Sequence, residues 1–464
     1  MKLIIKNQTL KFVALSMSLA FSVGSAPAFA KSTLSLQQAI QIAQKNDPWL
    51  QGNRLKESAT LNRSIAAGTL PDPRVSIAMM NLPADSWELD QENMTQVQVS
   101  VSQMLPRGDS NDIRKRQLQL ESNKYPLQRE DRLAKLKRQV SQLWMDVYLA
   151  QETIKLIKQD QVLFEQMAEV AKASYSTAVG RTRQQDVIRA QLELLQLEDR
   201  LTKEQQALET ASAKLNQWLY RYDANSVSYD LDLKPKPFQL PENMPGIKFK
   251  TALLPENWQL KPNQVARALS LHPAVLVLDV KQDVSRQSVE LSKQKYKPQW
   301  GINASYGYRD DRPSGESRSD LFSIGVSFDL PLFTESRQDK ERDAAIADSE
   351  AVKTEKLLVL KNMLSEMDKE QRRLTRLSQR QSLYETRLLT QAHEQAEVSL
   401  TAYTNDDGDF AEVVRARIAE LNARIALLDI KVNVLKSRVR LNYFLTQSNV
   451  QMTTQPSLNF GDKS

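Results

Sequence analysis

The segment LAKLKRQVSQLWMDVYLAQETIKLI, residues 133–157, decides how this chain folds. Its apolar side chains recur at alternating spacings of three and four residues: Leu133, Leu136, Val140, Leu143, Val147, Ala150, Ile154 and Ile157. A 3.5-residue repeat is the seam of a left-handed coiled coil. The pattern pauses at Gly180-Arg181-Thr182-Arg183 and resumes at Val187, Ala190, Leu194, Leu197 and Leu201. We therefore predict a helical hairpin over about residues 112–219, with a first arm roughly 100 Å long.

The first 30 residues are typical of a secretory signal peptide. Three lysines precede an apolar run at residues 12–21, and Ala28-Phe29-Ala30 has the small-residue pattern of a cleavage site. We predict cleavage after Ala30 and export of the mature chain. Removing this segment leaves 63 − 3 = 60 basic residues against 56 acidic ones, a net charge of +4. These charges are spread along helical faces without a nucleic-acid-binding motif, so we expect no nucleic-acid partner.

Four short stretches have the alternating pattern of β-strands, at about residues 73–83, 94–105, 298–310 and 320–331. In the third stretch, Trp300, Ile302 and Tyr306 alternate with small or polar residues. A half-buried soluble sheet gives the same period of two. Strands of about ten residues with aromatic residues near their ends are typical of membrane β-barrels. The export signal and the strand length favour the barrel over the soluble sheet. After the signal segment, no apolar run of 18 residues is available for a membrane helix.

The second half of the chain repeats the first at an offset of 225 residues without a gap. The matched pairs are Pro48 with Pro273, Pro73 with Pro298, Pro106 with Pro331, and Val101-Ser102 with Val326-Ser327. We predict a duplication, because chance is a poor explanation for so many matched breakpoints. The expected divisions are a first repeat at 31–219, a proline-rich linker at 220–261, a second repeat at 262–447 with its helical hairpin at about 337–447, and a C-terminal tail at 448–464.

Four strands per chain are too few for a closed membrane barrel, since the smallest barrels have about eight. Open strand edges cannot face lipid, so several chains must contribute to one barrel. Three copies would supply twelve strands, four from each, and their long helices would form a matching tube. The predicted fold class is therefore mainly α with a small β part, assembled as a trimer with a 12-stranded transmembrane β-barrel continued by an α-helical coiled-coil barrel.

Taken together, these features resemble the TolC family of outer-membrane efflux proteins. The resemblance covers residues 35–447, and its markers are the helix breaks Asp47-Pro48 and His272-Pro273, the prolines before the strands, and Asp186-Val187-Ile188 and Glu412-Val413-Val414 after the hairpin turns. It implies a homotrimer in the cell outer membrane of a Gram-negative bacterium, in contact with outer-membrane lipid and extending into the periplasm. It also implies the exit-duct role in a tripartite pump with a periplasmic adaptor and an inner-membrane transporter of the resistance-nodulation-division (RND) type.

Within this family, three stretches are most similar to the branch that exports heavy-metal cations. They are Leu70-Pro71-Asp72-Pro73 through Asn81-Leu82-Pro83, then Met94-Thr95-Gln96, and Gln103-Met104-Leu105-Pro106-Arg107-Gly108. Some members of that branch carry a lipidated N-terminal cysteine, which this cysteine-free chain lacks. Drug export, type I protein secretion, and a periplasmic coiled-coil scaffold without a pore remain the alternatives to metal export.

The second hairpin turn is the candidate gate of the duct. It contains Asp406, Asp407 and Asp409 around Gly408, a residue that suits the left-handed backbone of a tight turn. These aspartates are also ordinary turn and helix N-cap residues. In three copies they would form a ring of nine carboxylates that concentrates cations.

The resemblance places entrance-lining acidic residues at Glu412 and at Arg415, where the acid is replaced. Arg415 either neutralises Glu412 or faces outward, and Tyr403 and Arg417 are candidates for ties between helices.

The first hairpin turn, with Gly180, Arg181 and Arg183, is basic. It is either a solvated turn or, with Gly408 of the second turn, the place where the adaptor or the transporter docks. We expect no bound metal or cofactor, because His272 and His393 are isolated in the sequence and cysteine is absent. No enzyme class finds its minimum set of residues in this chain.

Overall fold

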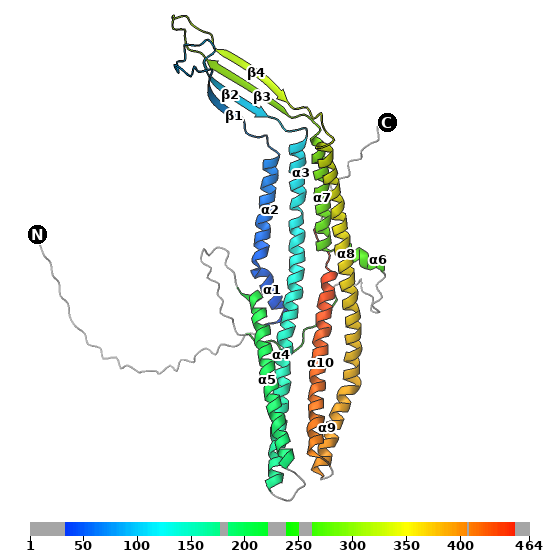
Figure 1. Ribbon diagram of the computed structural model, residues 1–464. Coiled ribbons are helices and arrows are strands. Elements are labelled where there is room, and N and C mark those ends of the chain that lie inside the picture. The colour runs from blue at the N-terminus through cyan, green and yellow to red at the C-terminus, as the bar shows by residue number, and fades with distance from the viewer. Residues whose placement is uncertain (1–32, 177–183, 221–237, 250–261, 406–407, 451–464) are drawn as a thin grey trace, which may run out of the picture.

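The computed structural model describes residues 33–176, 184–220, 238–249, 262–405 and 408–450. It is a long rod with a β-sheet at one end and two helical hairpin tips at the other (Figure 1). We call these the sheet end and the tip end. The predicted signal segment lies outside the described residues. Among the helices that are described, none is long and apolar enough to cross a membrane.

The helices begin where the sequence supplies N-caps and prolines. Helix α1 (Leu36–Asn46) starts with a capping box formed by Ser35 and Gln38. Helix α2 (Pro48–Ala67) follows at once, because Asp47 caps its first turn and Pro48 occupies its first position. His272 and Pro273 begin α7 (Pro273–Gln294) in the same way. Helices α3 (Ser110–Ser122) and α6 (Pro262–Ser270) complete the shorter helices.

Two long hairpins form the tip end. The first consists of α4 (Lys124–Ser176) and α5 (Gln184–Leu219). With 53 residues, α4 is about 80 Å long. The second consists of α8 (Gln338–Leu383), the π-helix η1 (Tyr384–Leu388), α9 (Leu389–Thr404) and α10 (Phe410–Phe444). In the predicted seam of α4, Leu136, Val140, Val147, Ala150 and Ile157 are buried.

Three apolar clusters hold the rod together along its length. One near the middle joins α1, α4, α5 and α10 to residue Leu240 of the linker. A second joins α6, α7, α8 and α10. The third lies near the tips, where Ile157 and Phe164 of α4 meet Leu197 of α5 and Leu421 of α10. Helix α10 belongs to all three clusters and is therefore the central helix of the rod.

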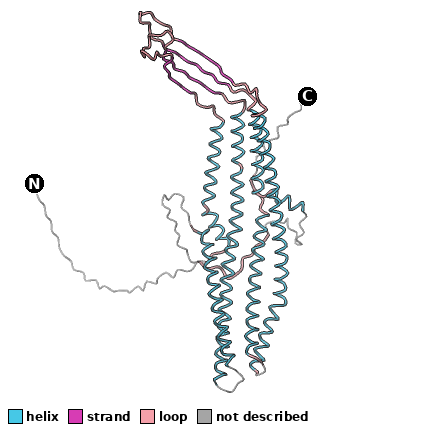
Figure 2. The backbone as a smooth tube through the Cα atoms, viewed as in Figure 1, coloured by secondary structure: helices cyan, strands magenta, loops and turns pink. Residues whose placement is uncertain are grey.

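The sheet has four antiparallel strands in the order β1-β2-β3-β4. They are β1 (Arg74–Met80), β2 (Gln96–Met104), β3 (Trp300–Tyr308) and β4 (Leu321–Phe328). Figure 2 shows these strands in magenta, projecting beyond the helices. One face is apolar and exposed, with Ile77 at 74% and Ile324 at 73%. The other face is small and polar, with Ser76 and Ser100 sharing a hydrogen bond. The expectation of a mainly helical molecule with a small antiparallel sheet is confirmed.

Candidate functional site at the hairpin tips

The turn between α9 and α10 depends on a close backbone approach at Gly408. A Cβ atom there would lie 2.7 Å from the backbone nitrogen of Tyr403 and 2.9 Å from the carbonyl carbon of Ala402. Such a contact forces the backbone to shift. The left-handed backbone predicted for Gly408 depends on Asp407, which lies outside the described residues, so it stays a prediction. Glycine is needed at position 408 because the end of α9 leaves no room for a side chain.

Helix α10 starts immediately after this turn with a polar cap and an aromatic contact. The Asp409 carboxylate accepts a hydrogen bond from the Ala411 N–H at 3.1 Å, as expected for an N-cap. Phe410 is buried, and its ring meets that of Tyr403 edge to face at 5.4 Å. The Tyr403–Phe410 contact therefore ties the end of α9 to the start of α10.

Glu412 and Arg415 lie in the first two turns of α10, and both are exposed. Arg415 Nε donates to the carbonyl oxygen of Ala411 at 3.2 Å on its own helix. Within the described residues, no ion pair links Arg415 to Glu412, which leaves the Glu412 carboxylate in the positive field of the helix N-terminus.

The other predicted tip residues cannot be placed in this structure. Asp406 and Asp407 of the second tip lie outside the described residues, as do Gly180, Arg181 and Arg183 of the first tip. Their roles in an acidic ring and in docking therefore stay predictions.

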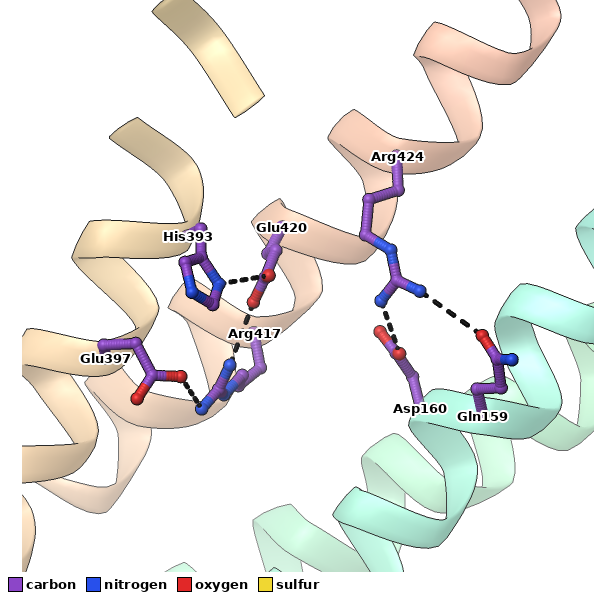
Figure 3. A network of polar contacts seen from close by, with 7 residues as sticks. All are labelled: Gln159, Asp160, His393, Glu397, Arg417, Glu420 and Arg424. Atoms are coloured by element: carbon purple, nitrogen blue, oxygen red, sulfur yellow. Dashed lines mark hydrogen bonds and ion pairs between the residues drawn. The ribbon is translucent and has the colours of Figure 1, made fainter. Parts of the chain in front are cut away.

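A polar network ties α9 to α10 two turns above the tip (Figure 3). Arg417 of α10 forms ion pairs with Glu397 of α9 at 2.7 Å and with Glu420 of its own helix at 3.0 Å. The Oε1 atom of Glu420 also lies 2.8 Å from Nδ1 of His393 on α9. Burial lowers the pKa of Arg417, but the hydrogen bonds and charges of Glu397 and Glu420 together outweigh this effect and hold its pKa above the ordinary value. The sequence-based expectation that Arg417 ties helices together is met within a single chain.

Two turns beyond Arg417, the same helix is tied to α4. Arg424 donates to the Asp160 carboxylate at 2.8 Å and reaches the Gln159 side chain (Figure 3). Asp160 is only 6% exposed. Burial raises the pKa of the Asp160 carboxyl, while the charge and hydrogen bond of Arg424 oppose that rise. We call the contacts of Arg417, Glu397, Glu420, His393, Arg424 and Asp160 the latch.

Sequence reasoning found only Arg417 of this latch. A signal exists in the sequence, since four cations recur every seven residues along α10: Arg417, Arg424, Lys431 and Arg438. A heptad spacing places such residues on one face of a coiled-coil helix. The third of them pairs with Glu385 of η1 at 2.9 Å. The spacing alone does not reveal the partners, which are as many as 265 residues away in the sequence.

The two histidines lie far from one another in roles that need no metal. His272 is fully buried at the start of α7, and its Nδ1 accepts from the Ala274 N–H at 3.2 Å. Nε2 therefore donates to the Tyr443 carbonyl at 3.1 Å. Burial lowers the pKa of His272. Among the described residues, no group of three or more acidic or histidine side chains is arranged to hold a metal ion.

Comparisons with known proteins identify the fold. No protein-family profile and no curated protein sequence matches this chain. The outer membrane protein VceC from Vibrio cholerae aligns with a TM-score of 0.71 at 12% identity, over 89% of this chain and 96% of VceC. The outer membrane channel CmeC of Campylobacter jejuni gives 0.69 at 14% identity, over 94% of each chain. CusC, whose structures concern transmembrane channel formation, gives 0.67 at 13% identity, over 95% and 99%.

These three proteins share one architecture, and this chain spans almost the full length of each. At identities of 12–14%, the likeness establishes the fold and leaves function to be argued from the molecule. The chain has the TolC-like fold, as the sequence predicted.

Proposed function

We propose that this protein is the outer-membrane exit duct of a tripartite efflux pump. One observation carries the proposal: a sheet with an exposed apolar face and two open edges ends a rod whose opposite end carries two hairpin tips (Figure 1). VceC and CmeC, which share this fold, are an outer membrane protein and an outer membrane channel. In three copies, four strands from each would close a 12-stranded barrel in outer-membrane lipid, because open edges cannot face hydrocarbon. The helices would continue as a tube through the periplasm.

The duct rests closed and opens when the second hairpin moves outward around residues 388–427. Two observations support this mechanism. Helix α9 is joined to α10 mainly through polar latch contacts, which an incoming charged partner can replace. The π-helix η1 also interrupts the outer arm just before α9, and such interruptions frequently mark functional sites. An adaptor that replaces these polar contacts would also have to move Tyr403, which packs against the apolar cluster near the tips.

The tips select what enters and which partners dock. Asp406, Asp407, Asp409 and Glu412 from three copies would surround the entrance with carboxylates that attract cations. The basic first tip, with Gly180, Arg181 and Arg183, and the turn at Gly408 would dock the periplasmic adaptor and the inner-membrane RND transporter through complementary charge.

Heavy-metal cations are the proposed cargo, on the basis of the sequence resemblance of residues 70–108 to the metal-exporting branch. A strain that lacks the protein should accumulate zinc, cadmium or copper and regain resistance when the gene is restored. Hypersensitivity to drugs alone, with normal metal content, would contradict the metal cargo and favour drug export.

Single-channel conductance in a planar bilayer tests the duct itself, together with the mass of the detergent-solubilised mature protein. A trimeric mass with a small, cation-preferring conductance is the expected result. A soluble monomer or dimer without conductance would refute the duct and favour a periplasmic scaffold. Changing Asp406, Asp407 and Asp409 together to Asn should reduce the cation preference, and unchanged selectivity would refute the acidic ring alone.

A further inference from the structure

The sheet ends in two unpaired edges, β1 and β4. We propose that β4 of one copy pairs antiparallel with β1 of the next copy in a single register, in which the numbers of paired residues add up to 405. The same sum holds within the chain between β2 and β3, from Val97 opposite Tyr308 to Met104 opposite Gly301. This inference rests on the proposed function, since it specifies how the copies of the duct join. The 225-residue duplication carries β2 onto β4 and β3 onto β1, which predicts the same sum for the joint. The two hairpins differ by two residues under this offset: the pairing of Arg74 with Ser102 would place residue 299 opposite Ser327, whereas Ser327 lies opposite Gly301. Sums of 403 and 407 are therefore the alternatives to 405.

The backbone groups of the two edges point in the required directions. Leu105 donates to the Trp300 carbonyl at 2.8 Å, so odd-numbered residues of β2 bond to β3 and even-numbered ones bond to β1. The odd-numbered residues of β1 therefore direct their N–H and C=O groups to the open edge. Asp329 donates to the Gln299 carbonyl at 3.3 Å, which leaves the even-numbered residues of β4 facing its open edge. A hydrogen-bonded pair across the joint therefore joins an odd-numbered residue of β1 to an even-numbered residue of β4, and the sum of their numbers is odd. Registers displaced by one residue, with sums of 404 or 406, are excluded.

The side chains of the two edges also match in this register. The apolar pairs across the joint are Val326 with Met79, Phe328 with Ile77, and Leu330 with Val75, and all six side chains are 50–74% exposed in the single chain. Between them, Ser327 lies opposite Ala78 on the polar face. The apolar face of the sheet would therefore continue from one copy to the next without a break.

The residues that the offset places at the ends of the strands are compatible with the sum 405. Within the chain, Arg107 pairs with Asp329 after β2. The 225-residue offset carries these positions to Leu332 and to Met104 of the next copy. Both mapped residues are apolar and exposed, at 71% and 45%. An ion pair at the joint within the chain is thus replaced by an apolar pair at the joint between copies, with both partners changed together.

A second contact shows the same paired change. Lys297 holds Asp109 at 3.0 Å within the chain. The offset carries Lys297 to Asp72 and Asp109 to Thr334, so a carboxylate would meet a hydroxyl donor. Two mapped contacts that keep their complementarity after both partners change are independent support for the register.

The proposed joint also explains an exposed apolar turn. After β2, Leu105, Pro106 and Arg107 are half-buried by β3 and the end of α7. After β4, the corresponding turn is exposed, with Leu332 at 71% and Phe333 at 91%. The start of β1 in the next copy would cover it.

The same sum extends to the helices below the sheet, where Gln117 of α3 donates to Ser288 of α7 at 2.8 Å. Mapped to the joint, α8 packs on α2 of the next copy. Near this register, Ile346 of α8 would meet Leu61 of α2, and Leu357 would meet Trp49. These four side chains are 39–66% exposed in the single chain.

Disulfide cross-linking tests the register directly, because the chain has no cysteine of its own. Ser327→Cys and Ala78→Cys in one chain place two small thiols opposite each other in a non-hydrogen-bonded pair. In such a pair the Cα atoms are about 4.5 Å apart, within disulfide range. Mild oxidation of the membrane-inserted protein should give a covalent trimer on non-reducing gels. The matched controls are Ser327→Cys with Ser76→Cys (sum 403) and Ser327→Cys with Met80→Cys (sum 407), which should cross-link several-fold less.

The outcomes separate the register from the duct. Stronger cross-linking of either control pair would overturn the sum of 405 and leave the trimeric duct standing. No cross-linking of any pair, in a protein with trimeric mass and normal conductance, would overturn the edge pairing itself. A monomeric mass for the unmodified chain would refute the proposed function.

A charge swap gives a second readout at the joint. Leu332→Arg and Met104→Asp should each weaken the detergent-solubilised trimer, whereas the double variant should restore it by recreating the Arg107–Asp329 pair between copies. A double variant no better than the singles would contradict the mapped contact.

Discussion

The two helical hairpins of this chain have similar outlines, and near the tips their arms are held together by different forces. The first joins α4 to α5 through buried apolar side chains such as Ile157 and Leu197, and the described residues include no ion pair between its arms. In the second, α9 buries only Ala396 and Ser399 and is tied to α10 by Arg417–Glu397 and His393–Glu420. An apolar seam loses its burial when its partners separate. Each ion pair between α9 and α10 has a partner that is at least half exposed and can be solvated when the pair opens. We therefore expect α4 and α5 of the first hairpin to remain packed together, and α9 to be the arm that moves.

The largest difference should come from the apolar seam. Ile157→Ala removes a fully buried side chain from α4 and should lower the free energy of unfolding by about 4 kcal/mol. Denaturant unfolding of the detergent-solubilised protein measures this loss. Leu195→Ala, at a position on α5 that is 63% exposed, is the matched control and should change stability by less than about 0.5 kcal/mol. Equal effects would show that the first hairpin does not depend on its buried seam.

The buried end of the latch comes next. Arg424→Met leaves the Asp160 carboxylate buried without its cation and should cost about 3 kcal/mol. Asp160→Asn should cost much less, because the Arg424 side chain is 30% exposed and can be solvated. If both substitutions were equally destabilising, the pair would act as a symmetrical bond rather than as a cation neutralising a buried acid.

The pH dependence of the Arg424→Met variant sharpens this test. The Asp160 pKa is raised on folding, so the folded state binds that proton more tightly than the unfolded state does. The destabilisation caused by the ionised carboxyl is therefore present at neutral pH. It is relieved as the pH falls through the raised pKa toward the ordinary value of 3.8. Unfolding curves of variant and wild type should converge in that acidic window, and Asp160→Asn with Arg424→Met should not show the convergence.

How much of this could be foreseen depends on the range of each interaction. The seam around Val140 and the strands around Ile302 follow from local periodicity, so the sequence predicted both. The close approach of Gly408 to Tyr403 does not follow from a local pattern, because it exists only once the turn between α9 and α10 has formed. The latch was mostly missed, since Asp160 and Arg424 meet across 264 residues and no local pattern joins them.

The end of the latch nearer the tip should have a smaller effect on stability and a larger one on conductance. Arg417→Met removes the tie to Glu397, an ion pair whose carboxylate is half exposed. It should lower the free energy of unfolding by about 1 to 2 kcal/mol, because the largely buried Glu420 carboxylate keeps His393 as a partner. In the bilayer assay the same variant should open more often than wild type, because α9 loses its main polar link to α10. A normal resting conductance would show that the latch does not hold the duct closed.

The smallest expected effect belongs to His393. His393→Gln removes one of the two partners of Glu420 while Arg417 keeps the other, so stability should change by less than about 0.5 kcal/mol. The His393→Gln variant is informative when it is combined with Arg417→Met, because His393 and Arg417 share the Glu420 carboxylate. If that carboxylate connects α9 to α10, the double variant should raise conductance by more than the sum of the single changes. Strictly additive changes would mean that each residue holds α9 independently, and the latch would then be two separate contacts rather than one network.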